Sequence, residues 1–182
     1  MNYLIQGISI LGMACHISSF QIKKNSLLFF AQLLGSTLFL VHYILLGAAT
    51  GAILNLIGVI RGIIFLQGEK LRKPWVLAAL WIMTIVAVWV TWNGSLSFDT
   101  NLNMEFWYNI FPLIAMLASS TAMHCNNGKV IRFAQLFLAS PGWLAYNIIV
   151  GSLGGALCEI FIITSTVVSF IRYGIDGFEK AK

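Results

Sequence analysis

Glu159 is the one charged residue between Gly151 and Ile171. Its position eight residues after Gly151 corresponds to about 12 Å of helix, close to the midplane of a bilayer. A carboxylate at that depth is costly unless it faces a cavity or a partner, so Glu159 predicts a functional site. Such a group could bind a cation or a polar solute, or carry a proton.

An earlier stretch, Gly47–Leu66, places Asn55 where the later stretch places Glu159, 104 positions further on. An Asn55–Glu159 pair at mid-depth could bind a polar ligand in a shared cavity. The alternative is a structural hydrogen bond between helices, worth about 0.6 kcal/mol on average. Small residues of the two stretches coincide at the same offset: Gly47, Gly51 and Ala52 with Gly151, Gly155 and Ala156.

Arg61 is a second charge within an apolar stretch, six positions beyond Asn55. It could pair with an anionic solute or with Glu159. Alternatively, its long side chain could extend to the lipid headgroups on the cytoplasmic side. Phe39 and Trp143, also 104 positions apart, offer flat aromatic walls for stacking against a ligand, although packing within the helices is the alternative.

His42 and Tyr146 are a further pair at this offset, followed by Tyr43 and Asn147. They could form an outer gate or a rim that orients a ligand. A belt of aromatic residues at the membrane interface is the alternative. We expect His16, near the end of the first apolar stretch, to lie at the opposite interface.

Pro112 and Pro141 interrupt apolar stretches in the second half of the chain. Proline within a membrane helix removes a backbone hydrogen bond and permits a kink, which a moving protein could use as a hinge.

Composition defines the class of protein. The 182 residues are 59% hydrophobic and 9% charged, whereas soluble domains carry about 25% charged residues. We therefore expect residues 1–182 to form a single membrane domain with the lipid bilayer as a partner. The net charge of +5 is spread among the helix-joining loops and does not indicate a nucleic-acid partner. The sequence contains no phosphate-binding glycine loop, metal-ligand cluster or catalytic triad spacing, so no enzyme activity, cofactor or metal is expected.

Hydropathy predicts seven transmembrane helices, the first of them retained rather than cleaved as a signal peptide. Ten of the eleven basic residues flank the spans on one side, which the positive-inside rule assigns to the cytoplasm. The N-terminus is then periplasmic and the C-terminus cytoplasmic. The predicted spans are Tyr3–Phe20, Leu27–Leu46, Gly47–Leu66, Trp75–Trp92, Phe106–Met123, Val130–Val150 and Gly151–Arg172.

An internal repeat relates spans one to three to spans five to seven. The letters FAQL occur at 30–33 and again at 133–136, an offset of 103 that becomes 104 after one extra residue in span six. Residues 3–66 and 106–172 then form two units of like orientation, joined by a linker helix at 75–92 and followed by a cytoplasmic tail, 173–182. The glutamines of the motif, Gln32 and Gln135, are expected to bond between helices of their own unit.

This all-α, 3+1+3 parallel repeat resembles the SWEET and PQ-loop transporters, a group that also includes the PnuC-type vitamin transporters. Within it, FAQL, GAILN at 51–55 and GSLGGALCE at 151–159 resemble the bacterial YgjV inner-membrane proteins. The resemblance implies two triple-helix bundles with a central path between them. SWEET-like proteins carry a substrate-facing asparagine on the third helix of each bundle. Asn55 matches the first, and Glu159 replaces the second.

These features predict a transporter or facilitator of an unknown small polar solute in the bacterial inner membrane. Alternating access would occur around a midplane site formed by Asn55 and Glu159. A non-transporting receptor on the same scaffold and a purely structural membrane subunit are the alternatives. One chain could enclose the pathway, and the sequence does not decide between a monomer and a homo-oligomer.

Overall fold

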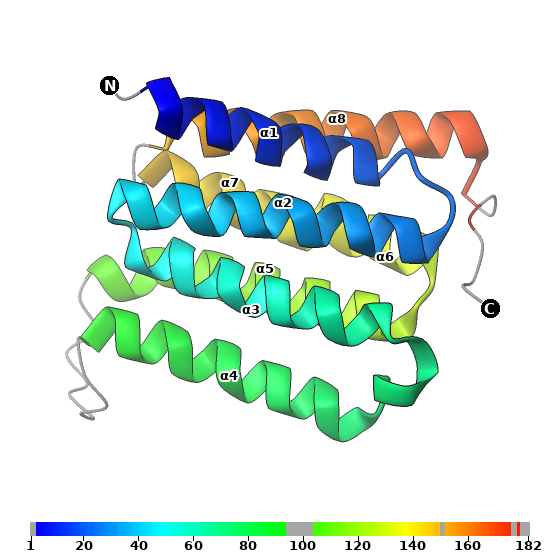
Figure 1. The fold of residues 1–182 in the computed structure, drawn as a ribbon, viewed down its shortest axis with the longest axis horizontal. Coiled ribbons are helices and arrows are strands. Elements are labelled where there is room, and N and C mark those ends of the chain that lie inside the picture. The colour runs from blue at the N-terminus through cyan, green and yellow to red at the C-terminus, as the bar shows by residue number, and fades with distance from the viewer. Residues whose placement is uncertain (1–2, 94–103, 150–151, 176–177, 179–182) are drawn as a thin grey trace.

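The computed structural model describes residues 3–93, 104–149, 152–175 and 178, and every regular element in them is helical. Figure 1 shows these elements as rods that run along one common direction. They are α1 (Tyr3–Ser19), α2 (Asn25–Leu46), α3 (Ala49–Leu66), the 3-10 turn η1 (Gly68–Leu71), α4 (Pro74–Asn93), α5 (Met104–Cys125), α6 (Gly128–Ala134), the π-helical segment η2 (Gln135–Ala139), α7 (Ser140–Ile149) and α8 (Leu153–Tyr173).

Four of the described helices are long and apolar enough to cross a membrane: Asn25–Leu46, Ala49–Leu66, Pro74–Trp92 and Gly154–Tyr173. A shorter apolar helix covers Gly7–Ser19. The sixth predicted span is divided among α6, η2 and α7, which follow one another directly. An all-helical membrane protein is therefore supported, and the full set of seven spans stays a prediction.

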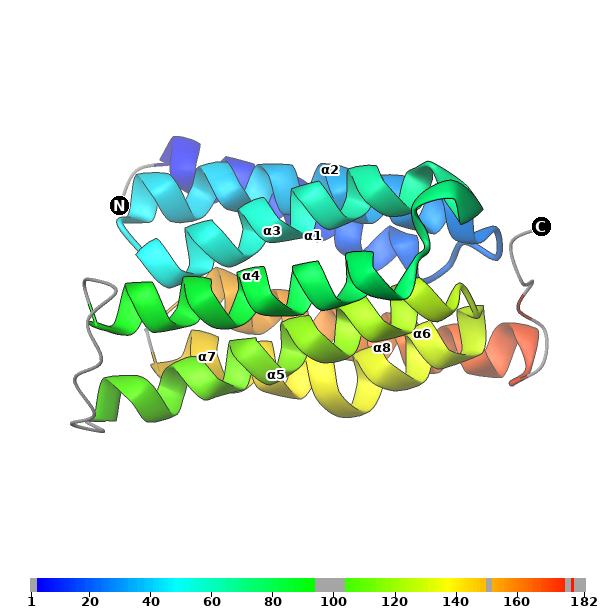
Figure 2. The ribbon, with the colours of Figure 1, turned by 90° about the horizontal axis from the view of Figure 1, so that it is seen from below.

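The helices form two facing layers. In one layer α2 packs between α1 and α3, and in the other α7 packs between α5 and α8. Figure 1 shows α4 along one edge, and Figure 2, seen from that side, shows it between α3 and α5, against both of which it packs. At the opposite edge α1 packs against α8, so the ring of helices is closed.

The short connection between α2 and α3 depends on Gly47. Its φ of +75° lies in the left-handed region that favours glycine. The backbone N–H of Ala48 bonds to the Tyr43 carbonyl at 3.0 Å, which satisfies an otherwise free group at the end of α2. Helices α2 and α3 therefore form a helical hairpin at Gly47, whereas the matching glycine of the second half, Gly151, lies outside the described residues.

The distribution of side chains is inverted relative to a soluble protein. Large apolar side chains are exposed along the outer faces, among them Leu34, Ile82, Phe137 and Ile171. Hydroxyl, amide and charged side chains are buried between the layers, among them Ser36, Thr84, Asn109, Arg132, Asn147 and Thr166. Apolar exposure on this scale fits contact with lipid.

The two ends of the bundle differ in charge. The α1–α2 loop, η1, the α5–α6 turn and the last turn of α8 lie together at one end in Figure 1, called here the basic end. Basic residues in these connections include Lys23, Lys24, Lys70, Arg72, Lys73, Lys129 and Arg172. The opposite end, which carries the α2–α3 turn, is called here the turn end.

Candidate functional site

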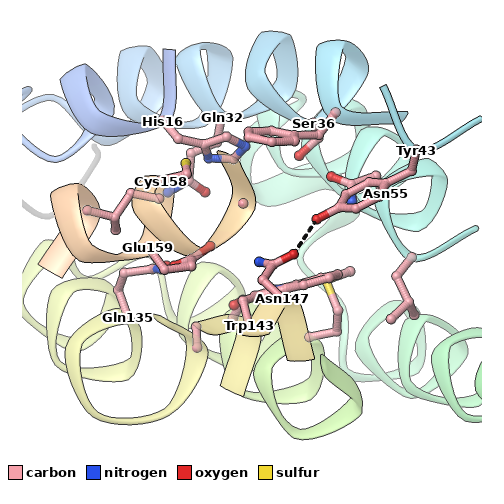
Figure 3. Close-up of a pocket in the computed structure, with 18 of the residues that line it drawn as sticks. His16, Gln32, Ser36, Tyr43, Asn55, Gln135, Trp143, Asn147, Cys158 and Glu159 are labelled. Carbon is pink, nitrogen blue, oxygen red and sulfur yellow. Dashed lines mark hydrogen bonds between the residues drawn. The ribbon is translucent and has the colours of Figure 1, made fainter. Parts of the chain in front are cut away.

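A cavity of about 70 Å³ lies between the two layers. At roughly 10–15 Å³ for each water, it has room for about five waters. Figure 3 shows His16, Gln32 and Ser36 on one wall, facing Trp143 and Asn147 across the opening. The further lining residues are Phe39, Tyr43, Leu54, Asn55, Gly58, Arg61, Met116, Ser119, Gln135, Ala139, Gly155, Cys158, Glu159 and Ile162.

Most of this lining comes from positions that match between the two halves of the sequence at an offset of 103 or 104. The cavity therefore lies where equivalent faces of the two layers meet. The matched lining pairs are His16 with Ser119, Gln32 with Gln135, Ser36 with Ala139, Phe39 with Trp143, Tyr43 with Asn147, Leu54 with Cys158, Asn55 with Glu159, and Gly58 with Ile162.

Glu159 lies on α8, is 9% exposed and lines the cavity. Ser140 hydrogen-bonds to its carboxyl group, and Gln135 donates from Nε2 to Ser140 Oγ at 2.8 Å. Gln135 Nε2 therefore bonds within the run of α6, η2 and α7, and not between helices as the sequence predicted. Glu159 Oε2 is buried and has no hydrogen-bond partner among the described residues, which leaves a strong acceptor for an occupant of the cavity.

Asn55 reaches the cavity from α3, on the side opposite Glu159 in Figure 3. Its Nδ2 donates to the carbonyl of Gly51 in its own helix at 2.9 Å. The side-chain oxygen is then the group that Asn55 can offer to a ligand. The structure thus brings both predicted mid-depth residues to one cavity without bonding them to each other.

Arg61 also lines the cavity and is only 6% exposed. Its Nη1 lies 3.4 Å from Ser120 Oγ and 4.0 Å from Met116 Sδ, while Nε is buried without a partner. Among the described residues it forms no ion pair with Glu159. A buried guanidinium without a counter-ion is costly, so this wall favours an anionic group.

His16 is half-buried in the cavity wall and lies within electrostatic reach of Arg61. The structure places it there rather than at the membrane interface where we expected it. Its ring packs against Phe39 at 5.6 Å between centroids. Gly35 makes room for it, because a Cβ at that position would lie 2.5 Å from His16 Cδ2. The glycine facing it on α2 is the sequence signal that could have located this residue.

Tyr43 and Asn147 close the cavity at the turn end. The Tyr43 hydroxyl donates to Asn147 Oδ1 at 3.0 Å, and both side chains are nearly fully buried. A second hollow of about 290 Å³ lies further toward the turn end and is lined by Tyr146, Tyr108, Asn109 and the α2–α3 turn. The predicted rim residue Tyr146 lines this hollow and not the central cavity.

His42, the remaining predicted rim residue, lies outside the lining of both hollows. It is 2% exposed, and its Nδ1 lies 3.2 Å from the carbonyl oxygen of Ile5 on α1. Phe39 packs against it edge to face at 6.1 Å. His42 therefore packs against the wall residue Phe39 without lining the cavity itself.

The two predicted hinge prolines lie on helices that pack closely against each other. Gly142, next to Pro141 on α7, approaches α5 so tightly that an added Cβ would lie 2.6 Å from the carbonyl oxygen of Phe111, the neighbour of Pro112. Pro141 also lacks the N–H that would continue an α-helical bond pattern, and the π-helical segment η2 directly precedes α7. That segment places Gln135 and Ala139 in the cavity wall.

No group of three or more histidine, cysteine, aspartate or glutamate side chains that could hold a metal ion is found among the described residues. Cys15, Cys125 and Cys158 are free thiols. The polar lining of the cavity consists of hydroxyl, amide, imidazole, carboxyl and guanidinium groups.

The apolar exterior, the long apolar helices and the polar interior define a multi-pass helical membrane protein. The chain belongs to the Imp-YgjV family, described as bacterial inner membrane protein, with residues 3–176 matching the family. The match confirms the expected YgjV resemblance and the bacterial inner membrane as the location. Neither a curated protein nor a solved structure matches the chain.

Proposed function

We propose that this protein is a transporter or facilitator of a small polar solute in the bacterial inner membrane, with Asn55 and Glu159 in the binding site. The observation that carries the proposal is the central cavity. It is polar, lies between two helical layers, and contains two buried groups, Arg61 Nε and Glu159 Oε2, without partners. Buried ionisable groups in membrane helices typically mark the paths of solutes or ions.

The proposed mechanism is alternating access by movement of one layer against the other. At the turn end, the Tyr43–Asn147 hydrogen bond joins the layers. At the basic end, Arg132 donates from Nη2 to the carbonyls of Phe20 and Ile22 at 2.9 and 2.8 Å. Opening toward either side would require one of these contacts to break while the other holds.

The internal 3+1+3 repeat is part of this proposal, as is the likeness to the SWEET, PQ-loop and PnuC transporters. Its support is the offset pairing of the lining and one repeated packing arrangement. An added Cβ on Gly51 would overlap Tyr43, and an added Cβ on Gly155 would overlap Asn147. The two glycines are 104 positions apart, and so are Tyr43 and Asn147. The gathering of basic connections at one end supports a cytoplasmic C-terminus and a periplasmic N-terminus.

A non-transporting receptor is a second candidate. The observation that favours it is that the cavity, of only about 70 Å³, has contacts between the two layers at both of its ends. Such a protein would bind its ligand without moving it. We propose no enzymatic activity and no nucleic-acid partner for either candidate.

Flux measurements in proteoliposomes test the proposal. We expect uptake of at least one labelled probe among glycerol, glycine, glycolate and ethanolamine, and a strong reduction with Glu159→Gln. Glu69→Gln is the matched control, because Glu69 lies exposed in η1, outside the cavity. Binding of a probe without flux would favour the receptor. Equal flux in wild type and Glu159→Gln at every pH tested would remove Glu159 from the pathway.

A further inference from the structure

We propose that the central cavity binds a small zwitterion, whose carboxylate contacts Arg61 and whose ammonium group contacts Glu159. The chemical class is an unbranched amino acid of about five to seven non-hydrogen atoms. This inference rests on the proposed function, because it names the kind of solute that the same site would accept.

The cavity wall carries buried groups of opposite charge on its two sides. Arg61 is permanently cationic and lies on α3, while Glu159 lies on α8 in the other layer. Both line one cavity, both are more than nine-tenths buried, and each keeps one polar atom without a partner. The other titratable ring in the wall, His16, lies on the Arg61 side. A ligand with one charge of each sign would satisfy both buried groups, whereas a singly charged ligand would leave one of them unpaired.

The two charged side chains come from separate levels of the cavity. Arg61 follows Asn55 by six residues, about 9 Å along α3, and Asn55 holds the position in its half that Glu159 holds in the other. The offset pairing therefore places Arg61 and Glu159 at different levels along the helix axes, so a ligand with its two charges at opposite ends can contact both. Direct contact between the two side chains is not formed among the described residues, which leaves this space for the ligand.

The size and lining of the cavity suit a small solute. A cavity of about 70 Å³ holds about five water-sized groups, which matches glycine and its nearest homologues. A hexose has more than twice as many non-hydrogen atoms as glycine. Ser36 and the amides of Gln32 and Asn55 offer further hydrogen bonds along the wall. Phe39 and Trp143 provide aromatic surface for the carbon atoms of the ligand.

Equilibrium binding to the purified full-length protein in detergent tests the inference with three probes of nearly equal size. Glycine carries both charges, glycolate only the negative one and ethanolamine only the positive one. We expect wild type to bind glycine about tenfold or more tightly than either of the others, since each loses one charged hydrogen bond. A series from glycine through β-alanine to 4-aminobutanoate reports the charge separation that the site prefers.

The variants assign the two ends of the ligand. Glu159→Gln should remove the preference for glycine over glycolate and keep the preference over ethanolamine. Arg61→Gln should do the reverse. Arg172→Gln, at the exposed end of α8, should preserve both preferences. Because each variant is judged by a ratio between probes, a general loss of folded protein does not produce the expected pattern.

The outcomes separate this inference from the proposed function. Glycine binding with no flux of any probe would overturn transport and support the zwitterion site. Flux of glycerol or glycolate, with glycine bound no better than glycolate, would overturn the zwitterion site and support transport. Equal binding of all three probes, or none, would also overturn the zwitterion site.

Discussion

Tyr43 donates a hydrogen bond of 3.0 Å to Asn147, although the two residues are 104 positions apart. Each lies near the end of the second long helical rod of its layer, and each packs against a glycine of the following helix, Gly51 or Gly155. The contact therefore joins equivalent points of the two layers. It closes the central cavity at the turn end, so opening of the cavity toward that end requires this hydrogen bond to break.

Tyr43→Phe removes this hydrogen bond and keeps the ring. A hydrogen bond contributes about 0.5–1.5 kcal/mol, so the population open at the turn end should increase about two- to tenfold. Cys158 reports the change, because it lines the cavity and is 2% exposed. In a background with Cys15→Ser and Cys125→Ser, we expect faster labelling of Cys158 by a membrane-impermeant thiol reagent in right-side-out vesicles.

The control for this prediction is Tyr173→Phe. Tyr173 donates to the carbonyl of Gln21 at 3.1 Å, so the same chemical change is made at the basic end. Labelling of Cys158 in right-side-out vesicles should not accelerate in this variant. Faster labelling with both tyrosine variants would indicate general loosening and contradict a gate at Tyr43.

Gly155→Ala should open the same contact from the other side. An added Cβ on Gly155 would overlap the Asn147 amide, which must then turn away from Tyr43. We expect faster labelling of Cys158, as with Tyr43→Phe. Because both changes remove one interaction, the double variant should label no faster than the faster single variant. Fully additive effects would show that Gly155 acts by another route.

The class of protein and much of the cavity could be predicted from the sequence. Charge is so rare in this chain that Glu159 and Arg61 stand out, and the offset between the halves pairs Asn55 with Glu159 and Phe39 with Trp143. All five residues line the cavity. The prediction of these cavity residues succeeds because a polar side chain on a membrane helix is costly against lipid. It is least costly in the space between helices.

The remaining site residues depend on packing that hydropathy does not record. His16 enters the cavity because Gly35 leaves space beside it, and His42 turns away to the carbonyl of Ile5. Hydropathy does not record the rotation of α1 and α2 about their axes, which decides where each histidine lies. Likewise, Gln135 bonds to Ser140 because the π-helical segment changes the register of its helix.

Gly142→Ala should destabilise the contact between α5 and α7. The added Cβ would lie 2.6 Å from the carbonyl oxygen of Phe111, a backbone atom that cannot rotate away. Overpacking of this kind costs about 1–3 kcal/mol, so Tm in detergent should fall. Gly7→Ala is the control, since nothing lies within 4 Å of a Cβ there and alanine favours a helix. A Tm for Gly142→Ala equal to that of Gly7→Ala would contradict the close approach.

Arg132 is fully buried at the basic end, and Arg132→Met should have the largest effect on stability among these variants. Its guanidinium donates to Ser169 Oγ at 3.2 Å and to the carbonyls of Gly128, Phe20 and Ile22 at 3.2, 2.9 and 2.8 Å. Methionine fills similar space but removes these donors, and each buried acceptor left unsatisfied, such as the carbonyls of Phe20 and Ile22, costs about 1–3 kcal/mol.

The free energy of unfolding should therefore fall by about 3 kcal/mol or more, measured by denaturation in detergent. Arg132→Lys keeps the charge without the planar fork and should lie between Arg132→Met and wild type. Arg172→Met, at an exposed position, should change the free energy of unfolding by no more than about 0.5 kcal/mol. If Arg132 also closes the basic end, Arg132→Lys should accelerate labelling of Cys158 in inside-out vesicles and not in right-side-out ones. A loss of stability without that asymmetry would restrict Arg132 to holding the two layers together.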